Sequence, residues 1–558
     1  MRTAIAAALA TVLSLAIPSR AAAGPEATPD TTTIQASPAE AAAVSGVGPG
    51  ASASPQVGTP TQAAPEVGAL AAPDDRGRQE GGIFYKGELG SPGAPRLEPT
   101  HNAFFVGVGY YNTGGWYGQH YARVTPELSL FLHPMKDQEL VLRLQAPVNM
   151  MIYDFQNKTS ANHGRYELRK ADWNTASDYL KVFKQVTLGR KEDHLFVNIG
   201  ITHGVSIGHG AVMRRYDANP DLDRTRLGLQ LDAYNDYAGF ESFLADIAFQ
   251  TQVMGGLVFV KPLSLFSDDV TAKSFSLGAH YTTDLEAPKS LVKQGAFIPT
   301  DSSGYPQHLS TQLGIYGFDI EVKPVHLGTW LDLKVYGDYS KIANAGGGMT
   351  GGLLMRSSFG SGKLVSAARV RLEARYYDNN YVPQYFDGLY EIEKFRMVHL
   401  PGNITNTPIA PAANLPTKYE AVVNAPSGGR HTSVYGEATY AIVNRLVLGA
   451  GLERVTDLGT YNLLVHLEVP AIEILRLYLS YQKLGFGSMG DALPKWQGKA
   501  WEALEPSVVL TAQARLMILP FLFLNGIARQ MYEWNQGVGV YESRLDYLAT
   551  LEVGWEFN

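Results

Sequence analysis

A strict alternation of charged and apolar residues over positions 365–378 is the feature that most limits how this chain can fold. The stretch reads VSAARVRLEARYYD. Its even positions from 368 to 376 are apolar or aromatic, and its odd positions carry Arg369, Arg371, Glu373 and Arg375. Because successive side chains of a β-strand point to opposite faces, this period of two predicts a strand that separates a polar medium from an apolar one. A helix would scatter the same residues around its circumference.

The same alternation recurs along residues 81–558, where turn signals interrupt it. The segments TRLGLQLDAYND, WLDLKVYGDY, ILRLYLSYQK and SVVLTAQARLM each carry one apolar face opposite a polar one. We expect about 18 such strands, with 16 or 20 as alternatives, and lengths near those needed for a tilted bilayer crossing. Short turns such as AIVNR alternate with long polar loops at 284–310 and 379–430, as in outer-membrane proteins. The expected fold class is all-β, a closed antiparallel transmembrane β-barrel.

A soluble β-sandwich also alternates polar and apolar residues, so further features are needed to separate the two architectures. Aromatic residues gather at the ends of the expected strands, as at Tyr110–Tyr111, Tyr376–Tyr377 and Tyr532–Trp534, which is typical of aromatic girdles at membrane interfaces. The chain ends on YLATLEVGWEFN. This alternating strand is similar to the C-terminal targeting strand of bacterial outer-membrane proteins, except that Asn558 follows the last aromatic residue. These features favour the barrel.

The N-terminus predicts export. Arg2 precedes the apolar run AIAAALATVLSLAI, and Ala21 and Ala23 supply the small residues of a cleavage site. We therefore expect residues 1–23 to be a signal peptide, with an uncleaved anchor as the alternative. Residues 24–80 are rich in Ala, Pro, Thr and Ser with almost no large apolar side chain, which predicts a disordered segment. Residues 81–558 would then form the barrel, in the bacterial outer membrane.

One segment, residues 169–186, departs from the strand pattern. Trp173, Ala176, Leu180 and Phe183 recur at helical spacing, and Asp172 is a suitable N-cap. We expect a short helix near residues 172–184. It would lie at the pore mouth or inside the lumen, or form only a helical turn in a large loop.

The stretch from residue 171 to 249, which includes HLFVNIGITHGVSIGHGAVMRRYDANPDLDRTRLGLQLDAYNDYAGFESFLADIAF, resembles a group of porin-like outer-membrane proteins. That group includes barrels proposed to secrete exopolysaccharide in predatory and gliding bacteria and, more loosely, the alginate exporter. The resemblance covers part of the chain and implies a barrel of roughly 16 to 18 strands with a polar lumen. Its motifs do not identify a polymer.

The charged side of each strand is expected to meet water inside the barrel, because a charge at the bilayer midplane costs about 2–4 kcal/mol. Arginine keeps its charge in any environment and offers several donors to carboxylates and sugar hydroxyls. An alternative is that these arginines only brace the wall through pairs with Asp338, Glu453 or Asp332. The expected ligand-binding residues of the lumen are Arg369, Arg371, Glu373, Arg375, Arg476, Arg515, Arg529, Asp332 and Lys334.

Residues 217–223 resemble part of a calcium loop, because YDANPDLDRT places oxygen-bearing side chains at alternate positions. Leu222 occupies the position where a calcium loop needs Gly, and Gly228 stands where the bidentate Glu should be. A polar turn capped by Asp and Asn side chains is favoured over a bound calcium ion.

Other catalytic and metal-binding patterns are weak. His203 and His209 are separated by six positions among glycines, with no neighbouring Cys or carboxylate, so two polar lumen residues are a better interpretation than a metal site. The sequence lacks a G-x-S-x-G, an H-E-x-x-H and any cysteine. We therefore expect no cofactor, no metal and no enzymatic activity. The formal net charge of −7 argues against a nucleic-acid partner.

The expected function is an outer-membrane pore that secretes a polysaccharide, expected to be acidic, through a charged lumen. The alternatives are a structural barrel that anchors a surface adhesion or motility assembly, and a general diffusion porin. The expected partners are the polysaccharide or small hydrophilic solutes, outer-membrane lipid, and periplasmic export or motility proteins.

Overall fold

The computed structural model describes most of the strands of the barrel region. By its internal contacts the chain divides into residues 1–64 and 65–558, and all described residues lie in the second unit. The predicted signal peptide (1–23) and disordered segment (24–80) therefore lie outside the described residues. The described residues are 102–113, 118–135, 138–154, 167–169, 172–173, 176–189, 194–219, 225–249, 251–294, 298–299, 306–327, 330–359, 366–395, 416–426, 428–442, 446–469, 474–493, 508–535 and 540–557.

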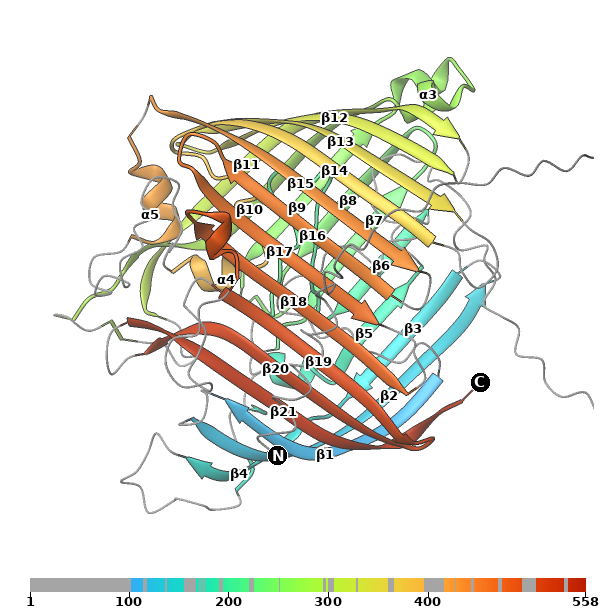
Figure 1. Ribbon diagram of the computed structural model, residues 1–558, viewed down its shortest axis with the longest axis vertical. Helices are drawn as coiled ribbons and strands as arrows, with labels where there is room; N and C mark the ends of the chain where they lie inside the picture. Colours follow the sequence, from blue (N-terminus) through green and yellow to red (C-terminus); the bar gives the residue numbers. More distant parts are fainter. Residues whose placement is uncertain are drawn as a thin grey trace, which may run out of the picture. The chain divides into compact units, whose positions relative to one another are not determined.

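Strands dominate the described residues (Figure 1). They are β1 (Asn102–Thr113), β2 (Gln119–Met135), β3 (Gln138–Gln145), β4 (Val148–Asp154), β5 (Phe183–Leu188), β6 (Leu195–Gly200), β7 (Gly228–Tyr234), β8 (Ala238–Leu244), β9 (Val253–Val260), β10 (Ser276–Leu291), β11 (His308–Leu327), β12 (Leu331–Ile342), β13 (Gly347–Phe359), β14 (Ser366–Asp378), β15 (Arg430–Ile442), β16 (Leu446–Val455), β17 (Thr460–Val469), β18 (Leu475–Phe486), β19 (Val508–Leu519), β20 (Leu522–Asn535) and β21 (Val540–Phe557).

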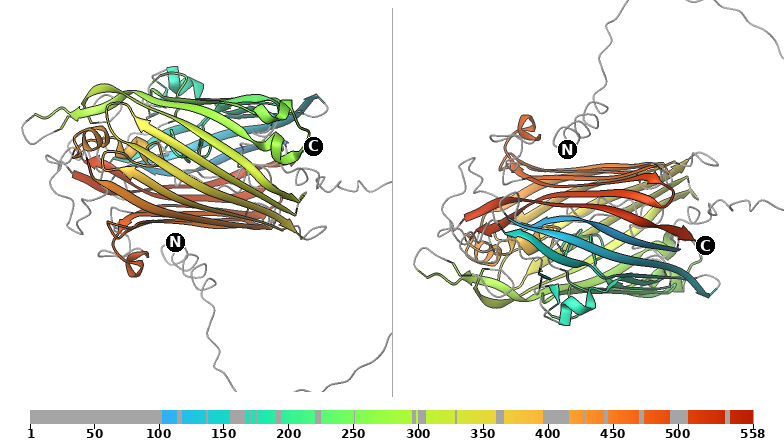
Figure 2. Two further views of the ribbon diagram at one scale, coloured as in Figure 1. Left: turned by 90° about the horizontal axis from the view of Figure 1, so that it is seen from above. Right: turned by 90° about the horizontal axis from the view of Figure 1, so that it is seen from below.

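The strands form one antiparallel sheet that closes on itself. Apart from β4, which pairs with β2, each strand pairs with the next along the chain, with β3 followed by β5. The sheet closes where β1 pairs with β21, with Asn102 opposite Phe557. Strands β3 and β4 both pair with β2 on either side of a short break, so 21 strands occupy 20 positions around the barrel. The prediction of a closed antiparallel barrel is confirmed, and 20 positions match the largest of the expected counts. Figure 2 shows the yellow strands around β13 and β14 on the wall opposite the blue strands.

The helices are short. They are α2 (Ala176–Leu180), η4 (Pro262–Leu265), α3 (Val270–Ser274), α4 (Tyr390–Glu393), α5 (Lys418–Val423) and η7 (Met489–Asp491). None of the helices in the described parts of the chain is long and apolar enough to span a membrane.

The helix predicted near residues 172–184 is present but shorter than expected. Helix α2 ends at Leu180, and Phe183 begins β5, which pairs with β3. The residues FKQVTL alternate in character, and backbone pairing with a strand already in place outweighs the weak helical spacing. Asp172 is buried, and its carboxylate accepts a hydrogen bond from Asn149 at 2.9 Å.

The two faces of the strands have the predicted orientation. On β14 the even positions point outward, with Leu372 and Tyr376 about half exposed, whereas Arg371 on the odd face is fully buried in the interior. The end of β21 likewise exposes Leu551, Val553 and Trp555. A closed barrel has no free sheet edge, and an apolar outer surface is what a bilayer requires. The barrel is thus built to span a membrane.

The aromatic pairs at strand ends do not all belong to an outer girdle. Tyr376 is exposed on the outside, but its neighbour Tyr377 is 2% exposed and packs inside the barrel. Tyr111 is also fully buried, where it stacks on Tyr121 with ring centroids 6.0 Å apart. The expectation was wrong for these residues because adjacent side chains on a strand point to opposite faces.

The two ends of the barrel differ in the length of their connections. At the end where β1 starts and β21 finishes, most connections are short, as at residues 136–137, 443–445 and 520–521. Residues 261–275, with η4 and α3, are a longer connection at this end. The opposite end carries the long connections, and Figure 1 shows α4 and α5 there. This asymmetry agrees with the expected arrangement of short turns and long loops.

Candidate functional site: inward loops and a charged lumen

Two of the long connections fold into the barrel. We call residues 201–219, which follow β6, the first inward loop, and residues 379–395, which follow β14, the second inward loop. The amide of Arg214 donates to the carbonyl of Phe386 at 3.0 Å, and the amide of Phe386 donates to the carbonyl of Val212 at 3.1 Å. The two loops therefore run beside each other as one unit.

An apolar cluster joins the inward loops to the wall. Its members are buried almost completely, and they come from both loops and from the inner faces of several strands. The loop residues are Val205, Ile207, Val212, Met213, Tyr216, Ala218, Tyr381, Tyr385, Phe386 and Tyr390. The sequence-based expectation that the polar face of β14 meets water is therefore wrong: it meets these loops, because their side chains fill the lumen at that level.

The tip of the first inward loop depends on glycine. Gly208 and Gly210 have φ angles of +55° and +75°, in a region that other residues rarely adopt. This conformation lets the amide of Gly208 donate to Oε2 of Glu241 on the wall at 2.9 Å. His209 stacks on Tyr336 at 4.1 Å, with its Nε2 3.1 Å from Glu321 Oε2. The loop is thus fixed to the inner wall at its tip.

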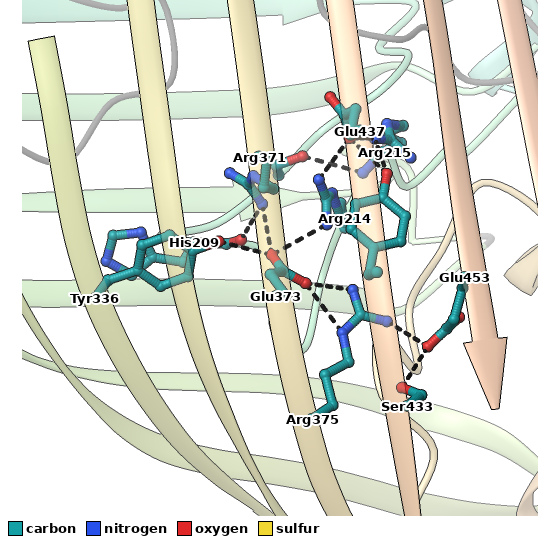
Figure 3. Close-up of polar contacts among 12 residues, drawn as sticks. His209, Arg214, Arg215, Tyr336, Arg371, Glu373, Arg375, Ser433, Glu437 and Glu453 are labelled. Carbon is teal, nitrogen blue, oxygen red and sulfur yellow. Dashed lines mark hydrogen bonds and ion pairs between the residues drawn. The ribbon is translucent and has the colours of Figure 1, made fainter. Parts of the chain in front are cut away.

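Glu437 of β15 is the point where the wall holds the first inward loop (Figure 3). Its carboxylate accepts from Arg214 Nη2 at 2.7 Å and from Arg215, both in the loop. It also accepts from Arg369 Nη1 at 2.5 Å, which comes from the neighbouring strand β14. Glu437 is 3% exposed, so these are buried ion pairs in which each partner is needed to stabilise the others.

Glu373 is a second buried carboxylate in the same network. It accepts from Arg371 Nη1 at 3.1 Å, from the Tyr336 hydroxyl at 2.7 Å and from Arg375. Arg214 lies 3.4 Å from it. Figure 3 shows Glu373 between these donors, so the alternating stretch of β14 supplies both a carboxylate and the arginines around it.

Arg375 extends the network to the next strand. Its Nη1 donates to Glu453 Oε1 at 2.7 Å, and Ser433 donates to the same oxygen at 2.8 Å. The ring of Tyr435 lies against Arg375 at 4.8 Å and against Arg214 at 4.6 Å, a cation–π arrangement on both guanidinium groups. The predicted bracing of an arginine by Glu453 is therefore present.

The remaining predicted lumen residues lie elsewhere in the interior. Asp332 pairs with Arg356 at 2.8 Å, and Lys334 pairs with Glu321 at 3.1 Å. These pairs lie toward the end of the barrel where β12 begins. The structure therefore brings Arg369, Arg371, Glu373 and Arg375 into one network and places Asp332 and Lys334 outside it.

Three further predicted arginines lie on the strands that lead to the C-terminus. Arg515 Nε donates to Glu552 Oε2 at 2.8 Å, and Arg476 Nη2 donates to Glu556 Oε1 at 3.3 Å. Arg529 is 2% exposed on β20. All three lie outside the Glu437 network, and whether any of the nine predicted residues binds cargo stays a prediction.

Glu391 of α4 ties the two inward loops together. Its carboxylate accepts from the Tyr216 hydroxyl and from Arg226 Nη1, each at 2.7 Å, and lies 3.1 Å from Lys394 Nζ. Burial alone would raise the pKa of Glu391, but the nearby Lys394 and Arg226 outweigh it and hold that pKa below its ordinary value. Glu391 therefore stays ionised as the buried anchor between the loops.

Two inward-loop residues carry backbone strain. Arg215 and Gln384 have φ angles of 52° and 54°, in the left-handed region, although neither is glycine. Such a conformation costs about 1–3 kcal/mol and persists only where surrounding contacts enforce it. Arg215 is held by Tyr435 and Glu437 of the wall, and the amide of Gln384 donates to the carbonyl of Ala211 at 2.8 Å. One strained residue therefore lies where a loop meets the wall, and the other lies where the two loops meet.

The sequence-based reasoning missed Arg214, Arg215, Glu391 and Glu437. A usable signal existed for Glu437, which sits at an inward position of the alternating stretch RHTSVYGEATYAI opposite Arg371. The arginine pair in AVMRRYD stands in an irregular, glycine-rich segment. No periodic pattern indicates that such a segment folds back into the lumen.

His203 and Asp217, from the two segments with possible metal-binding patterns, have ordinary polar partners. His203 Nδ1 lies 2.8 Å from Asp217 Oδ1, and that oxygen also accepts from the amide of Asn219 at 2.8 Å, as in a polar turn. Asp221 and Asp223 lie outside the described residues. Within the described residues, three or more His, Cys, Asp or Glu side chains do not come together as a metal site.

Comparison with known proteins gives only distant similarity. No protein-family model and no curated protein matches the chain. Among solved structures, Pseudomonas aeruginosa OccK11 (OpdR) is 9% identical with a TM-score of 0.31, covering 84% of this chain and 99% of that one. Pseudomonas aeruginosa OccK8 (OprE) is 12% identical with a TM-score of 0.29, covering 83% and 99%. Acinetobacter baumannii OccAB4 is 9% identical with a TM-score of 0.29, covering 83% and 100%. Similarity at this level establishes neither a family nor a function.

Proposed function

We propose that this protein is an outer-membrane pore for small hydrophilic solutes, held closed by its two inward loops. The observation that carries the proposal is the Glu437 carboxylate, which binds Arg369 of the wall and Arg214 and Arg215 of the first inward loop. A purely structural barrel could fill its lumen with apolar side chains. A network of buried ion pairs between wall and loop suits a contact that must separate and re-form in water.

The barrel itself supports the membrane location. Its outer face is apolar and its strands are paired all the way around, which are the two requirements for a spanning sheet. Most connections are short at the end of the barrel where β1 starts and β21 finishes. In outer-membrane barrels the end with short turns is the periplasmic one. The inward loops would then enter from the cell surface.

The cargo expected from the sequence is a finer form of the same proposal. When the inward loops leave the lumen, Arg371 loses its hydrogen bond to the carbonyl of His209, which measures 2.8 Å in the closed state. Arg369 and Arg375 keep their carboxylate partners on the wall. A carboxylate of an acidic polysaccharide could then take the place of the His209 carbonyl on Arg371, with Arg369 and Arg375 beside it on the same strand face. Small anionic solutes would use the same contacts in a diffusion pore.

Planar-bilayer recordings test the closed-pore proposal. The double variant R214Q/R215Q removes both loop cations that bind Glu437, so we expect more frequent openings and a larger mean conductance than in the parental protein. Arg430 is a matched control, because it is an exposed arginine near the same end that pairs with Asp378 at 3.6 Å. R430Q should leave the conductance unchanged.

Two outcomes would contradict the proposal. If R214Q/R215Q inserts normally and conducts like the parental protein, the loops do not control the pore. If neither protein conducts, the alternative of a structural barrel that anchors a surface assembly is favoured. Export of an acidic polysaccharide by cells that carry the parental or variant gene then tests the cargo separately.

A further inference from the structure

A cavity of about 130 Å³ with a mixed polar and apolar lining lies between the second inward loop and the wall formed by β15 to β18. The loop contributes residues 382–384, 387, 388 and Glu393, and the wall contributes Glu453, Asn462 and Gln482 among others. Lys418 of α5 completes one side. The cavity adjoins the Glu437 network through Arg214 and Arg215, so it lies beside the contact that closes the proposed pore.

Two residues that line this cavity each carry a buried acceptor atom with no donor among the described residues. Glu393 is 5% exposed, and its Oε1 has no hydrogen-bond partner among the described residues. The same holds for the buried Oε1 atom of Gln482 on β18, again within the described part of the chain. A buried acceptor left without a partner costs about 1–3 kcal/mol. Unpaired acceptors that line a cavity therefore indicate a site for a molecule that brings hydrogen-bond donors.

The charges around Glu393 favour a cation. Lys418 Nζ lies 3.6 Å from Glu393 Oε2 and 3.9 Å from Asp387 Oδ1, so a single ammonium group serves two carboxylates. The other cations that line the cavity, Arg214 and Arg215, are already bound to Glu437. The acidic end of the cavity therefore has one positive charge fewer than it has carboxylates.

We infer that this cavity is a binding site for a small solute that carries an ammonium group, which would bind to Glu393 Oε1 and Gln482 Oε1. The inference rests on the proposed pore function and adds a class of solute to it. An ammonium group donates up to three hydrogen bonds and carries the charge that the two carboxylates lack. The cavity volume suits a solute of a few heavy atoms.

The protonation state of Glu393 gives this site a pH dependence. Burial raises the pKa of Glu393 to about 7, with Lys418 opposing the shift and Asp387 adding to it. Only the ionised carboxylate attracts an ammonium group, so binding should weaken on acidification. The ionised fraction, and with it the affinity, should fall about tenfold from pH 8 to pH 6. The charged and titratable groups that line this cavity are Arg214, Arg215, Tyr377, Asp387, Lys418, Tyr435 and Glu453.

Ligand-observed NMR on the full-length protein in detergent micelles tests the inference. The probes are ethylammonium, acetate and ethanol, which are similar in size but differ in charge. We expect saturable binding of ethylammonium only, with an affinity that falls about tenfold between pH 8 and pH 6. The variant E393Q should weaken ethylammonium binding at pH 8 at least about tenfold and remove its pH dependence. Glu420 of α5 does not line the cavity, so E420Q is the matched control and should behave as the parental protein.

Several results would overturn the inference. Ethylammonium binding that is the same in E393Q, or that does not saturate, would show that the cavity is not an ammonium site. Saturable binding of acetate that is lost in E393Q and strengthened at low pH would assign the site to an acid instead. Because binding in micelles needs no conductance, a failure here is separate from a failure of the closed-pore proposal, which the R214Q/R215Q recordings test.

Discussion

Arg214 Nη2 lies 2.7 Å from Glu437 Oε2, and the two residues are 223 positions apart in the sequence. The first belongs to a loop that folds back into the barrel and the second to the barrel wall. Both side chains are almost completely buried. The contact between wall and loop is therefore an ion pair held away from bulk water, where each partner depends on the other.

The variant E437Q should loosen the first inward loop. It leaves Arg214, Arg215 and Arg369 without their shared carboxylate, and loss of one partner of a buried ion pair typically costs about 3–5 kcal/mol. We expect faster hydrogen exchange at residues 205–218 and a more conductive pore. The matched control is E556Q, because Glu556 pairs with Arg476 in a partly exposed position. Loss of that ion pair should lower the stability of the protein by less than about 1 kcal/mol. Equal exchange rates in the two variants would contradict the role of Glu437.

The arginines of β14 should set the ion selectivity of the open pore. Replacing Arg369, Arg371 and Arg375 with Gln removes three positive charges from one strand face and loosens the loop that Arg371 holds. We expect the reversal potential in a salt gradient to shift toward cation selectivity, and export of an acidic polymer to fall. If the variant inserts and both measurements stay at the parental level, these arginines only brace the wall and an anionic cargo should be abandoned.

The inward loops should become less tightly docked as pH rises through neutrality, because of Glu393. Its pKa is raised from 4.5 to about 7 in the folded protein, so its contribution to docking is fully present below about pH 4.5 and is lost as pH rises through 7. At pH 8 the buried Glu393 carboxylate must ionise, which weakens docking of the loop. The variant E393Q avoids this cost, so hydrogen exchange of residues 381–395 should slow at pH 8, by an amount that corresponds to up to roughly 3 kcal/mol of docking free energy. At pH 5 the variant and the parental protein should exchange alike.

Glu391 should affect the pH dependence of loop docking in the opposite direction to Glu393, so it serves as an internal control. Its pKa is lowered, so its contribution is present above the ordinary glutamate range and is lost as pH falls through the lowered value. E391Q should therefore speed exchange at pH 8, where E393Q slows it. The same direction of change in both variants would show that the two carboxylates do not act as the structure indicates.

The Ala-, Pro-, Thr- and Ser-rich segment should be dispensable for barrel formation. A segment that buries little apolar surface contributes few contacts to the folded state. Deletion of residues 30–75, with the signal region kept, should still give an outer-membrane protein that migrates differently on gels before and after boiling. A deleted chain that accumulates in the periplasm would show that the segment takes part in insertion.

The barrel could be predicted because its determinants are local. In one strand, successive side chains point to opposite faces, so Arg369 and Arg371 share one face and Val370 and Leu372 share the other. A charge that faces lipid is too costly to allow the reverse orientation. The same logic also identifies which residues point inward. It does not distinguish a water-filled interior from a protein-filled one, since both accept polar side chains.

The filling of the lumen was decided by tertiary structure alone. The GITHGVSIGHGAVMRRYD stretch has no periodicity that shows where it goes, and its place depends on Glu437, Tyr336 and Phe386, which are far away in the sequence. Arg214 becomes a wall contact only when the barrel has closed and brought β15 to face the loop. The sequence by itself determined which residues face lipid and which face the interior, because that follows from a period of two. Only the closed barrel decided which interior charges meet, because their partners come from strands and loops that no local pattern connects.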